Sequence, residues 1–207
     1  MIPKIIHQVF LGQTESLEKY PNFIKNKVVW QDWCKENNWD YNFYDKNDVI
    51  NLIEDEDLLK FYNNLTFNWQ RIDFCRYIII NKFGGLYVDL DIEIKEPQKG
   101  SLATYILNQD YIIGLWHNKK TNKTEMTNSL IGYKSGELSD LIKYSISETK
   151  KKKQMEIYKT WKIRFFLQTT GVRMFNRWCK IKKYKPNWEI YKYLKDGCSA
   201  TWLKNFN

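Results

Sequence analysis

The chain has 207 residues, of which 43% are hydrophobic and 16% aromatic, and this composition supports a folded core and excludes an intrinsically disordered protein. Its 33 Lys and Arg residues outnumber its 24 Asp and Glu residues, and the net charge of +9 attracts polyanions such as nucleic acid, an anionic membrane surface or phosphorylated small molecules. Four widely spaced Cys and only two His exclude a zinc finger and predict reduced thiols.

The apolar segments of the chain are short. The opening run is broken within a few residues by Pro3 and Lys4 and does not resemble a secretory signal, and no stretch approaches the roughly 18 apolar residues of a transmembrane helix. We therefore expect a cytoplasmic protein without a transmembrane segment, for which peripheral membrane contact stays open. The many Lys, Asn and Ile residues are typical of an AT-rich genome, such as that of a bacterium or a large DNA virus, and a viral protein would act in the host cytoplasm.

The first part of the chain alternates between strand and helix patterns. In order, we expect a strand at 4–11, a helix at 21–38, a strand at 39–44, and helices at 49–54 and 58–63. A turn precedes the helix at 49–54, and Asp48 is expected to be the N-cap of that helix.

The second part continues this alternation. We expect a helix at 69–83, a strand at 86–94, strands at 111–116 and 129–133, a helix at 138–148 and a helix around 164–180. Gly84-Gly85 ends the helix at 69–83, because glycine adopts the left-handed conformation freely. The run Lys150–Lys153 is expected to be a solvated loop. The alternation predicts a single α/β domain over residues 1–207, with a mainly parallel, Rossmann-like sheet flanked by helices.

A D-x-D sequence follows an apolar strand pattern. Residues i and i+2 of a strand share a face, so Asp89 and Asp91 are expected to point the same way. Two such carboxylates repel each other unless a cation lies between them, and Mg²⁺ and Mn²⁺ prefer oxygen ligands. In open α/β sheets, ligands bind at the carboxyl ends of the strands. The pattern therefore predicts a Mn²⁺ or Mg²⁺ site at Asp89 and Asp91.

The helix before this strand carries a second charged pair. Asp73 and Arg76 are three residues apart and share a helix face, which the Gly-Gly turn folds back beside the D-x-D sequence. Arg76 is expected to brace the carboxylates or a bound diphosphate. Asp73 is expected to accept hydrogen bonds from a ribose or sugar hydroxyl. An ordinary surface ion pair is the structural alternative for these two residues.

These segments resemble a known family. The pattern Asp73-x-x-Arg76 followed by Gly84-Gly85-x-Tyr87-x-Asp89-x-Asp91 resembles the sugar-binding D-x-D region of family 32 glycosyltransferases, which include initiating mannosyltransferases and capsular polysaccharide enzymes; the glucosylating toxins of clostridia carry a related pattern. The opening I-P-K-I-I-H-Q-V-F-L-G is also similar to that family's first strand. Weaker similarities occur at residues 128–132, at Thr170-Gly171, where Val172 replaces the usual Pro, and at Thr201-Trp202.

The resemblance implies a role for each matching position. Val9 and Phe10 match the place where relatives hold the nucleotide base, Asp73 and Arg76 match the pair that contacts sugar or ribose, and Tyr87 matches an aromatic residue near the nucleotide. Asp89 matches the aspartate that faces the sugar or ribose, Asp91 the direct metal ligand, and Trp202 an aromatic residue that closes over the diphosphate. The implied catalytic residues are Asp89, Asp91 and Arg76.

The resemblance also implies a GT-A fold and a metal-dependent hexosyltransferase. The expected donor is a nucleoside-diphosphate sugar, with a UDP-sugar favoured over a GDP-sugar, and the expected acceptor is a hydroxyl of a glycan or glycoprotein. Retention of the anomeric configuration is favoured. A D-x-D phosphohydrolase, a basic nucleic-acid-binding module and an inactive scaffold are the alternatives, although the chain lacks a nucleic-acid-binding motif. His7 is expected to be a core residue, whereas His117 is open between a ligand and a loop residue.

Overall fold

A computed structural model describes residues 1–12, 16–95, 99–118 and 122–197. Within these residues the strands are β1 (Ile5–Val9), β2 (Asp40–Tyr44), β3 (Gly85–Val88), β4 (Ile92–Ile94), β5 (Ile112–Asn118), β6 (Lys123–Tyr133) and β7 (Leu194–Asp196). The helices are α1 (Pro21–Asn37), α2 (Lys46–Leu52), α3 (Glu56–Asn63), α4 (Asn68–Phe83), α5 (Lys99–Leu107), α6 (Ser139–Gln154), α7 (Ile157–Thr160), α8 (Lys162–Thr169) and α9 (Val172–Ile181), with 3-10 turns at Leu17–Lys19 and Trp188–Lys192.

The central sheet has five strands in the order β2-β1-β3-β6-β5. β1 pairs in parallel with both β2 and β3, whereas β6 is antiparallel to β3 and to β5, so that only β6 runs against the other strands. This arrangement confirms the expected mainly parallel sheet. A separate two-stranded sheet joins β4 to β7 in antiparallel fashion. The strands that run in parallel end at one edge of the sheet, where α/β proteins bind their ligands.

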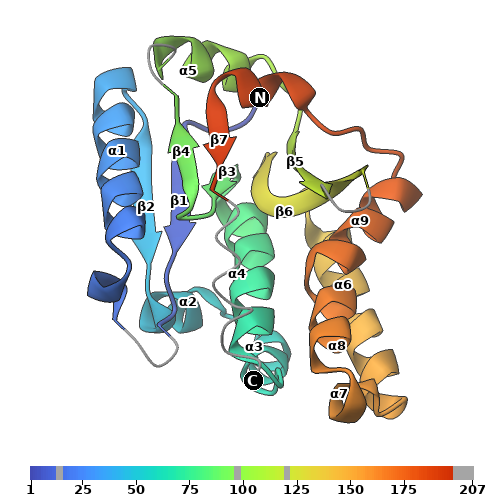
Figure 1. The fold of residues 1–207 in the computed structure, drawn as a ribbon. Coiled ribbons are helices and arrows are strands. Elements are labelled where there is room, and N and C mark those ends of the chain that lie inside the picture. Colours follow the sequence, from blue (N-terminus) through green and yellow to red (C-terminus); the bar gives the residue numbers. More distant parts are fainter. Residues whose placement is uncertain (13–15, 96–98, 119–121, 198–207) are drawn as a thin grey trace.

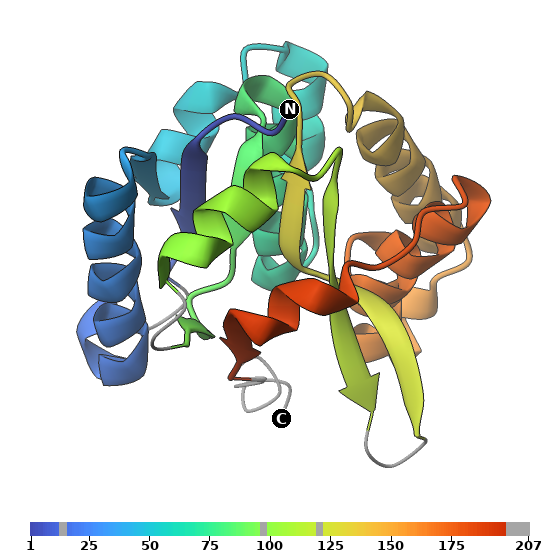
Figure 2. The ribbon, with the colours of Figure 1, turned by 90° about the horizontal axis from the view of Figure 1, so that it is seen from above.

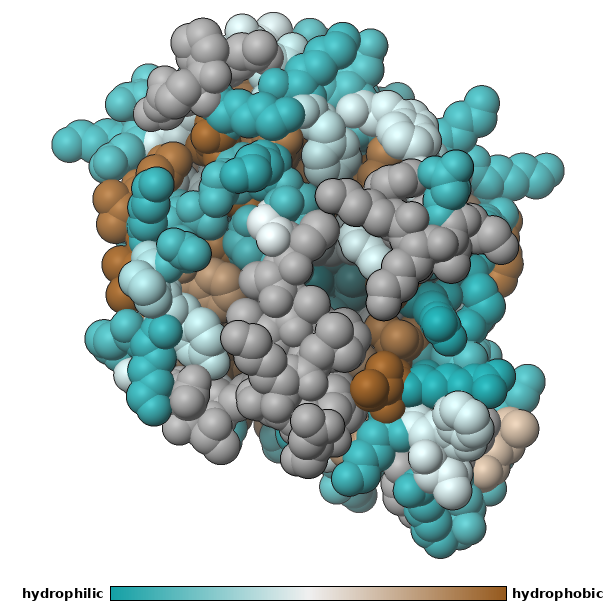
Figure 3. Space-filling model, viewed as in Figure 1, coloured by the Kyte–Doolittle hydropathy of each residue, from teal (hydrophilic) through white to brown (hydrophobic). Residues whose placement is uncertain are grey.

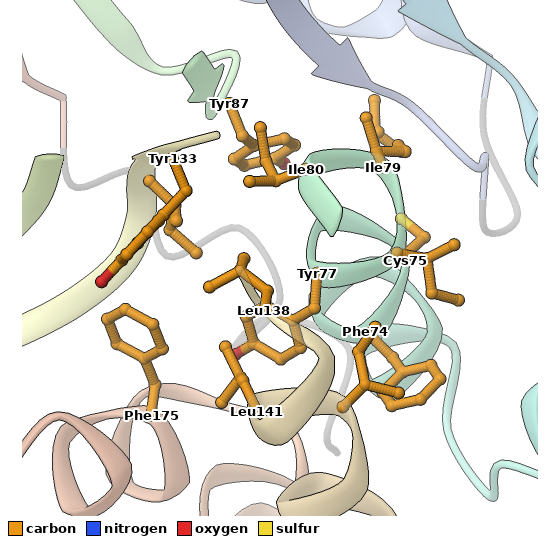
Figure 4. Packing of buried hydrophobic residues seen from close by; sticks show 14 of the residues in the cluster. Phe74, Cys75, Tyr77, Ile79, Ile80, Tyr87, Tyr133, Leu138, Leu141 and Phe175 are labelled. Carbon is orange, nitrogen blue, oxygen red and sulfur yellow. The ribbon is translucent and has the colours of Figure 1, made fainter. Parts of the chain in front are cut away.

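Helices cover both faces of the sheet, and each face has its own hydrophobic core. Leu86 and Val88 of β3 pack with Trp30 and Trp33 of α1, whereas Tyr87 belongs to the opposite cluster. That second cluster joins side chains from α4, β3, β6, α6 and α9 (Figure 4). Figure 1 shows α4 beside the sheet, and Figure 2 shows the strands between α1 on one side and α6 to α9 on the other. No helix in the described ranges is both long and apolar enough to cross a bilayer.

Several predicted elements need correction. The expected strand at 86–94 is two strands with a turn at 89–91, and the expected helix at 164–180 is broken between α8 and α9. Asp45 rather than Asp48 is the N-cap of α2, because its carboxylate accepts the backbone N–H groups of Asn47 and Asp48 at 2.7 and 2.9 Å. The run Lys150–Lys153 is the C-terminal end of α6 and not a loop, and α5 was not predicted.

The junction between α4 and β3 requires glycine. Gly84 follows the last turn of α4 with a φ of 67°, and Gly85 has a φ of 90°. A Cβ atom on Gly85 would lie 2.6 Å from the carbonyl oxygen of Ile5 and 2.9 Å from Nε2 of His7. Only glycine therefore lets β3 start this close to β1, which is what brings the D-x-D sequence beside the end of β1.

His7 is a core residue, as expected. Its ring is fully buried, its Nε2 lies 2.9 Å from the carbonyl oxygen of Gly84, and its Nδ1 lies 3.0 Å from the hydroxyl of Tyr44. The carbonyl can only accept, so Nε2 carries the hydrogen and Nδ1 accepts from the tyrosine. Burial lowers the pKa of His7 from 6.5 to about 4. The folded protein therefore holds this ring neutral.

We expect His7 to make the fold sensitive to mild acid. The unfolded chain binds a proton at His7 below pH 6.5, whereas the folded chain does so only below about pH 4, so stability falls as the pH falls through this window. By this linkage the loss between neutral pH and about pH 5 is about 2 kcal/mol. His7→Gln keeps a donor for Gly84 and removes the titration. Urea unfolding at both pH values checks this, and an unchanged difference in the variant would show that other groups cause the acid sensitivity.

Candidate active site

The D-x-D sequence forms a turn at the carboxyl end of β3. The backbone N–H of Asp89 donates to the carbonyl of Ser129 at 2.9 Å, and the N–H of Ile92 donates back to the carbonyl of Asp89 at 3.0 Å. The expected strand geometry for Asp89 and Asp91 is therefore wrong, because the ladder between β3 and β6 ends at Val88. Both aspartates still belong to one turn; desolvation raises the pKa of Asp89, and the charge of Asp91 adds to this rise.

Arg76 joins this turn to α4. Its Nη2 lies 3.0 Å from Oδ1 of Asp73 and 3.4 Å from Oδ1 of Asp89, and its Nη1 donates to the carbonyl of Asn128 at 2.7 Å. The guanidinium also lies over the ring of Tyr87, 4.8 Å from its centroid. Asp73 and Arg76 are both buried, so they are not a surface ion pair. One buried cation thus fixes the helix carboxylate relative to the turn carboxylate.

Asp89 is held from two sides and remains accessible. The hydroxyl of Tyr87 donates to its Oδ1 at 2.6 Å, and Arg76 approaches both carboxylate oxygens, while 28% of the side chain stays exposed. Desolvation raises the pKa of Asp89 to about 7; Arg76 opposes this shift, Asp91 adds to it, and Tyr87 opposes it. A cation bound beside this carboxylate would favour its charged form.

Asn128 completes the buried network, and sequence reasoning missed its role. Its side-chain amide donates to Oδ1 of Asp73 at 2.9 Å and to the hydroxyl of Tyr77 at 2.8 Å. The pairing register between β5 and β6 shifts between Ile113 and Gly114 of β5. Asn128 lies in the stretch of β6 opposite this shift. Bulges of this kind often aim a side chain at an active site. The only signal in the sequence was the weak family similarity at residues 128–132.

Asp73 retains one unused acceptor. Its Oδ2 is buried and has no hydrogen-bond partner among the described residues. A Cβ atom on Gly171, at the start of α9, would lie 3.0 Å from this oxygen. Desolvation raises the pKa of Asp73 to about 6, against the influence of Arg76 and Asn128. The break between α8 and α9 thus places Gly171 next to Oδ2 of Asp73, an oxygen that can accept another hydrogen bond.

The other predicted base-contact residues lie at the end of β1. β1 and β3 are neighbours, with His7 opposite Tyr87, so Val9 and Phe10 lie at the same edge of the sheet as the D-x-D turn. The side chain of Val9 belongs to the core, which leaves only its backbone for a ligand. Phe10 is half-buried, and its ring meets Tyr20 edge-on at 6.0 Å.

The last described residues also reach this turn. β7 pairs with β4, and the N–H of Gly197 donates to the carbonyl of Asp91 at 2.8 Å. A Cβ atom at position 197 would lie 2.5 Å from that oxygen. Trp202 lies outside the described residues, so its predicted position over the diphosphate stays a prediction. His117 is in β5, and its side chain also lies outside the description.

Comparisons with known proteins point to glycosyltransferases. Residues 9–106 match the family model described as a glycosyltransferase sugar-binding region containing a DXD motif. The chain is 27% identical over 122 residues to the inositol phosphoceramide mannosyltransferase 1 of Schizosaccharomyces pombe, a match that covers 55% of this chain and 36% of the relative. It is 29% identical over 97 residues to an uncharacterized glycosyltransferase of Acanthamoeba polyphaga mimivirus, which covers 44% of this chain and 36% of that protein.

These matches span little more than a third of either curated relative. Among solved structures, the PaToxG glycosyltransferase superposes with a TM-score of 0.57 at 14% identity, over 87% of this chain and 70% of that one. This likeness concerns the fold. The site at the end of β3 lies within the matched segment of the family model. Residues 9–106 are therefore similar to a glycosyltransferase sugar-binding region with a DXD motif, in a chain that has the GT-A fold.

Proposed function

We propose that this chain is a metal-dependent hexosyltransferase that transfers a sugar from a nucleoside-diphosphate sugar to a hydroxyl of a glycan or glycoprotein. The observation that carries the proposal is the turn at Asp89 and Asp91, held at the ligand-binding edge of the sheet by Arg76. A UDP-sugar is the favoured donor and a GDP-sugar the alternative. The match of residues 9–106 to a glycosyltransferase sugar-binding region supports the transfer of a sugar.

The residues of the turn fit Mn²⁺ or Mg²⁺. Within the described ranges no group of three or more His, Cys, Asp or Glu side chains gathers at one point, so a cation at this turn would take Asp89 and Asp91 as its carboxylate ligands from the described residues. Mg²⁺ commonly binds one or two carboxylates and takes its remaining oxygen ligands from substrate phosphates and water. We assign the direct contact to Asp91. Bound there, the cation would neutralise charge on the departing diphosphate.

The side chains around the turn would hold the donor. Arg76 and Tyr87 fix the carboxylate of Asp89, which stays accessible to a ribose or sugar hydroxyl. Oδ1 of Asp73 contacts Arg76 and Asn128, and these contacts orient the carboxylate. Its Oδ2 is suited to accept a hydrogen bond from another hydroxyl of the nucleotide sugar. If the transfer retains configuration, an oxygen of the leaving diphosphate takes the acceptor proton, so the chain needs no separate base.

A donor screen tests this proposal. Ligands that bind only the native state raise the melting temperature by mass action. We expect UDP-sugars with Mn²⁺ to stabilise the protein more than either component alone, and UDP-sugars more than GDP-sugars. Stabilisation by GDP-sugars alone would change the donor assignment. If every nucleotide sugar fails with both Mn²⁺ and Mg²⁺, the proposed reaction is wrong.

Phe10 is proposed to stack on the nucleotide base. A ring-to-base contact is worth about 1–3 kcal/mol, so Phe10→Ala is expected to weaken UDP binding by roughly 5- to 150-fold. Calorimetric titration with UDP and Mn²⁺ measures this. Phe23→Ala is the matched control, since Phe23 is also half-buried and stacks on Tyr20 at 5.2 Å. A loss of stability in Phe10→Ala without a loss of UDP affinity would make Phe10 a packing residue only.

Gly197 is proposed to set the position of Asp91. The methyl group of Gly197→Ala would have to displace the Asp91 carbonyl, which lies only 2.5 Å from the new atom. Misplacing a functional group by about 1 Å can cost roughly 100-fold, and we expect a roughly 10- to 100-fold loss in Mn²⁺-dependent UDP affinity. Lys195→Ala on the same strand is the control, because it removes only an exposed contact with Glu93. If the two variants bind UDP with equal affinity, Gly197 does not set the position of Asp91.

A further inference from the structure

The far end of the α6–α8 region carries most of the net charge. Residues 150–164, called the helical tip below, cover the end of α6, all of α7 and the beginning of α8. They contain seven Lys or Arg residues and one acidic residue, Glu156, which gives a net charge of +6 within a chain of +9. Figure 1 places α7 and the adjoining ends of α6 and α8 at the lower end of the molecule. The tip is therefore a compact source of positive potential.

Only part of this charge is used within the protein. Lys152 lies 3.1 Å from Glu148, and Lys153 donates to the carbonyl of Asn64 at 2.7 Å. Glu148 also pairs with Arg177, so its negative charge does not neutralise the other basic residues of the tip. Lys159 pairs with the exposed Glu156 at 2.6 Å, an interaction that water screens. Other basic residues of the tip face solvent, namely Lys150, Lys151, Lys162 and Arg164.

Large apolar side chains lie among these charges. Met155 and Trp161 are 60% and 61% exposed, and Ile163 is also exposed. The guanidinium of Arg164 lies 5.8 Å from the ring centroid of Trp161, so a cation and an aromatic surface are presented together. In Figure 3 the lower right of the molecule, where Figure 1 shows α6 to α8, is covered mainly by hydrophilic side chains with paler ones between them. Trp, Ile and Met gain by leaving water, whereas Lys and Arg gain by meeting anions.

We propose that the helical tip docks on the surface of an anionic lipid bilayer. Basic side chains beside Trp and aliphatic residues match the boundary between lipid headgroups and acyl chains. A nucleic acid would also attract the charge, but the aliphatic Met155 and Ile163 have no counterpart on a phosphate backbone. In Figure 1, β1 and β2 point toward the same lower side as the tip, so a bilayer at the tip lies on the side to which the sheet's ligand-binding edge faces. The docking does not depend on the proposed reaction.

Vesicle sedimentation tests this inference. We expect the protein to sediment with vesicles of phosphatidylcholine containing about 30% phosphatidylserine, to stay in solution with pure phosphatidylcholine, and to be released by about 0.5 M salt. The variant Lys150→Gln, Lys151→Gln, Lys159→Gln, Lys162→Gln is expected to bind at least about 100-fold more weakly, since each basic residue near an anionic leaflet contributes about fivefold. Trp161→Ser with Ile163→Ser should weaken binding with all charges kept.

A charge-matched variant is the control. Lys25→Gln, Lys35→Gln, Lys46→Gln, Lys60→Gln removes four exposed charges from α1, α2 and α3 and is expected to bind the vesicles nearly as well as the unmodified chain. Equal weakening by the two fourfold variants would mean that net charge acts without a docking surface, and the proposal would fail. It would also fail if the protein bound single-stranded oligonucleotides through the tip but not the anionic vesicles. Circular dichroism and melting curves show whether each variant is folded.

Discussion

Replacing Asp91 by Asn is expected to abolish Mn²⁺-dependent UDP binding and to leave the fold intact. The amide keeps the size of the side chain but loses the negative charge that a hard divalent cation prefers. Changes in groups that only support a metal ligand cost about 10- to 100-fold in metal affinity, so loss of a direct ligand should cost more than about 100-fold. The backbone of the turn stays held by the bond between Gly197 and the Asp91 carbonyl.

Calorimetric titration of UDP in the presence of Mn²⁺ measures this effect. Asp57→Asn is the control, because Asp57 is an exposed residue of α3 and its substitution changes the net charge equally. The control should bind UDP like the unmodified chain. If Asp91→Asn also binds normally and keeps its dependence on Mn²⁺, the metal assignment at this residue is wrong.

The second large effect is expected at Arg76. In Arg76→Met, the buried Asp73 and the partly buried Asp89 lose the cation that lies 3.0 and 3.4 Å from their oxygens. Removing one partner of a buried ion pair typically costs about 3–5 kcal/mol, because the remaining charge is left uncompensated. Arg76 lowers the pKa of both carboxyl groups, so its loss also raises both pKa values. At neutral pH the two groups are then charged less of the time and accept hydrogen bonds from the sugar donor less well.

Denaturant unfolding at neutral pH tests this prediction. Arg177→Met is the comparison, because the Arg177 side chain is 38% exposed, and a partly solvated ion pair contributes up to about 1 kcal/mol. Adding Asp73→Asn to Arg76→Met should restore part of the lost stability, since it removes one of the unpaired charges. If Arg76→Met costs no more than Arg177→Met, the buried network does not stabilise the site as we describe.

Local signals in the sequence predict which residues meet at the centre of the candidate site. The helix at α4 has a strong apolar pattern that ends in Gly84-Gly85, and the D-x-D sequence follows within a few residues. Short connections of this kind leave few alternatives for the direction of the next strand. The sequence therefore predicted that Asp73, Arg76 and Asp89 would meet, although it assigned the aspartates to a strand rather than to a turn.

The remaining features depend on contacts between distant segments. Asn128 reaches Asp73 only because β6 is irregular opposite β5, and a single Asn in a strand has no signature of its own. At the break between α8 and α9, the hydroxyl of the distant Tyr77 donates to the carbonyl of Thr170 at 2.6 Å. Thr124 and Glu125, near the start of β6, are polar and not buried, so the sequence there shows no apolar alternation that would predict a strand.

Donor turnover tests the central claim most directly. The unmodified chain is incubated with a UDP-sugar with Mn²⁺ and with a chelator, and release of UDP is measured beside the same reactions with Asp91→Asn and Asp57→Asn. We predict that UDP is released only with Mn²⁺, that Asp57→Asn behaves like the unmodified chain, and that Asp91→Asn is inactive. Equal UDP release with the chelator, or full activity of Asp91→Asn with Mn²⁺, would contradict a metal-dependent glycosyltransferase site at the DXD turn.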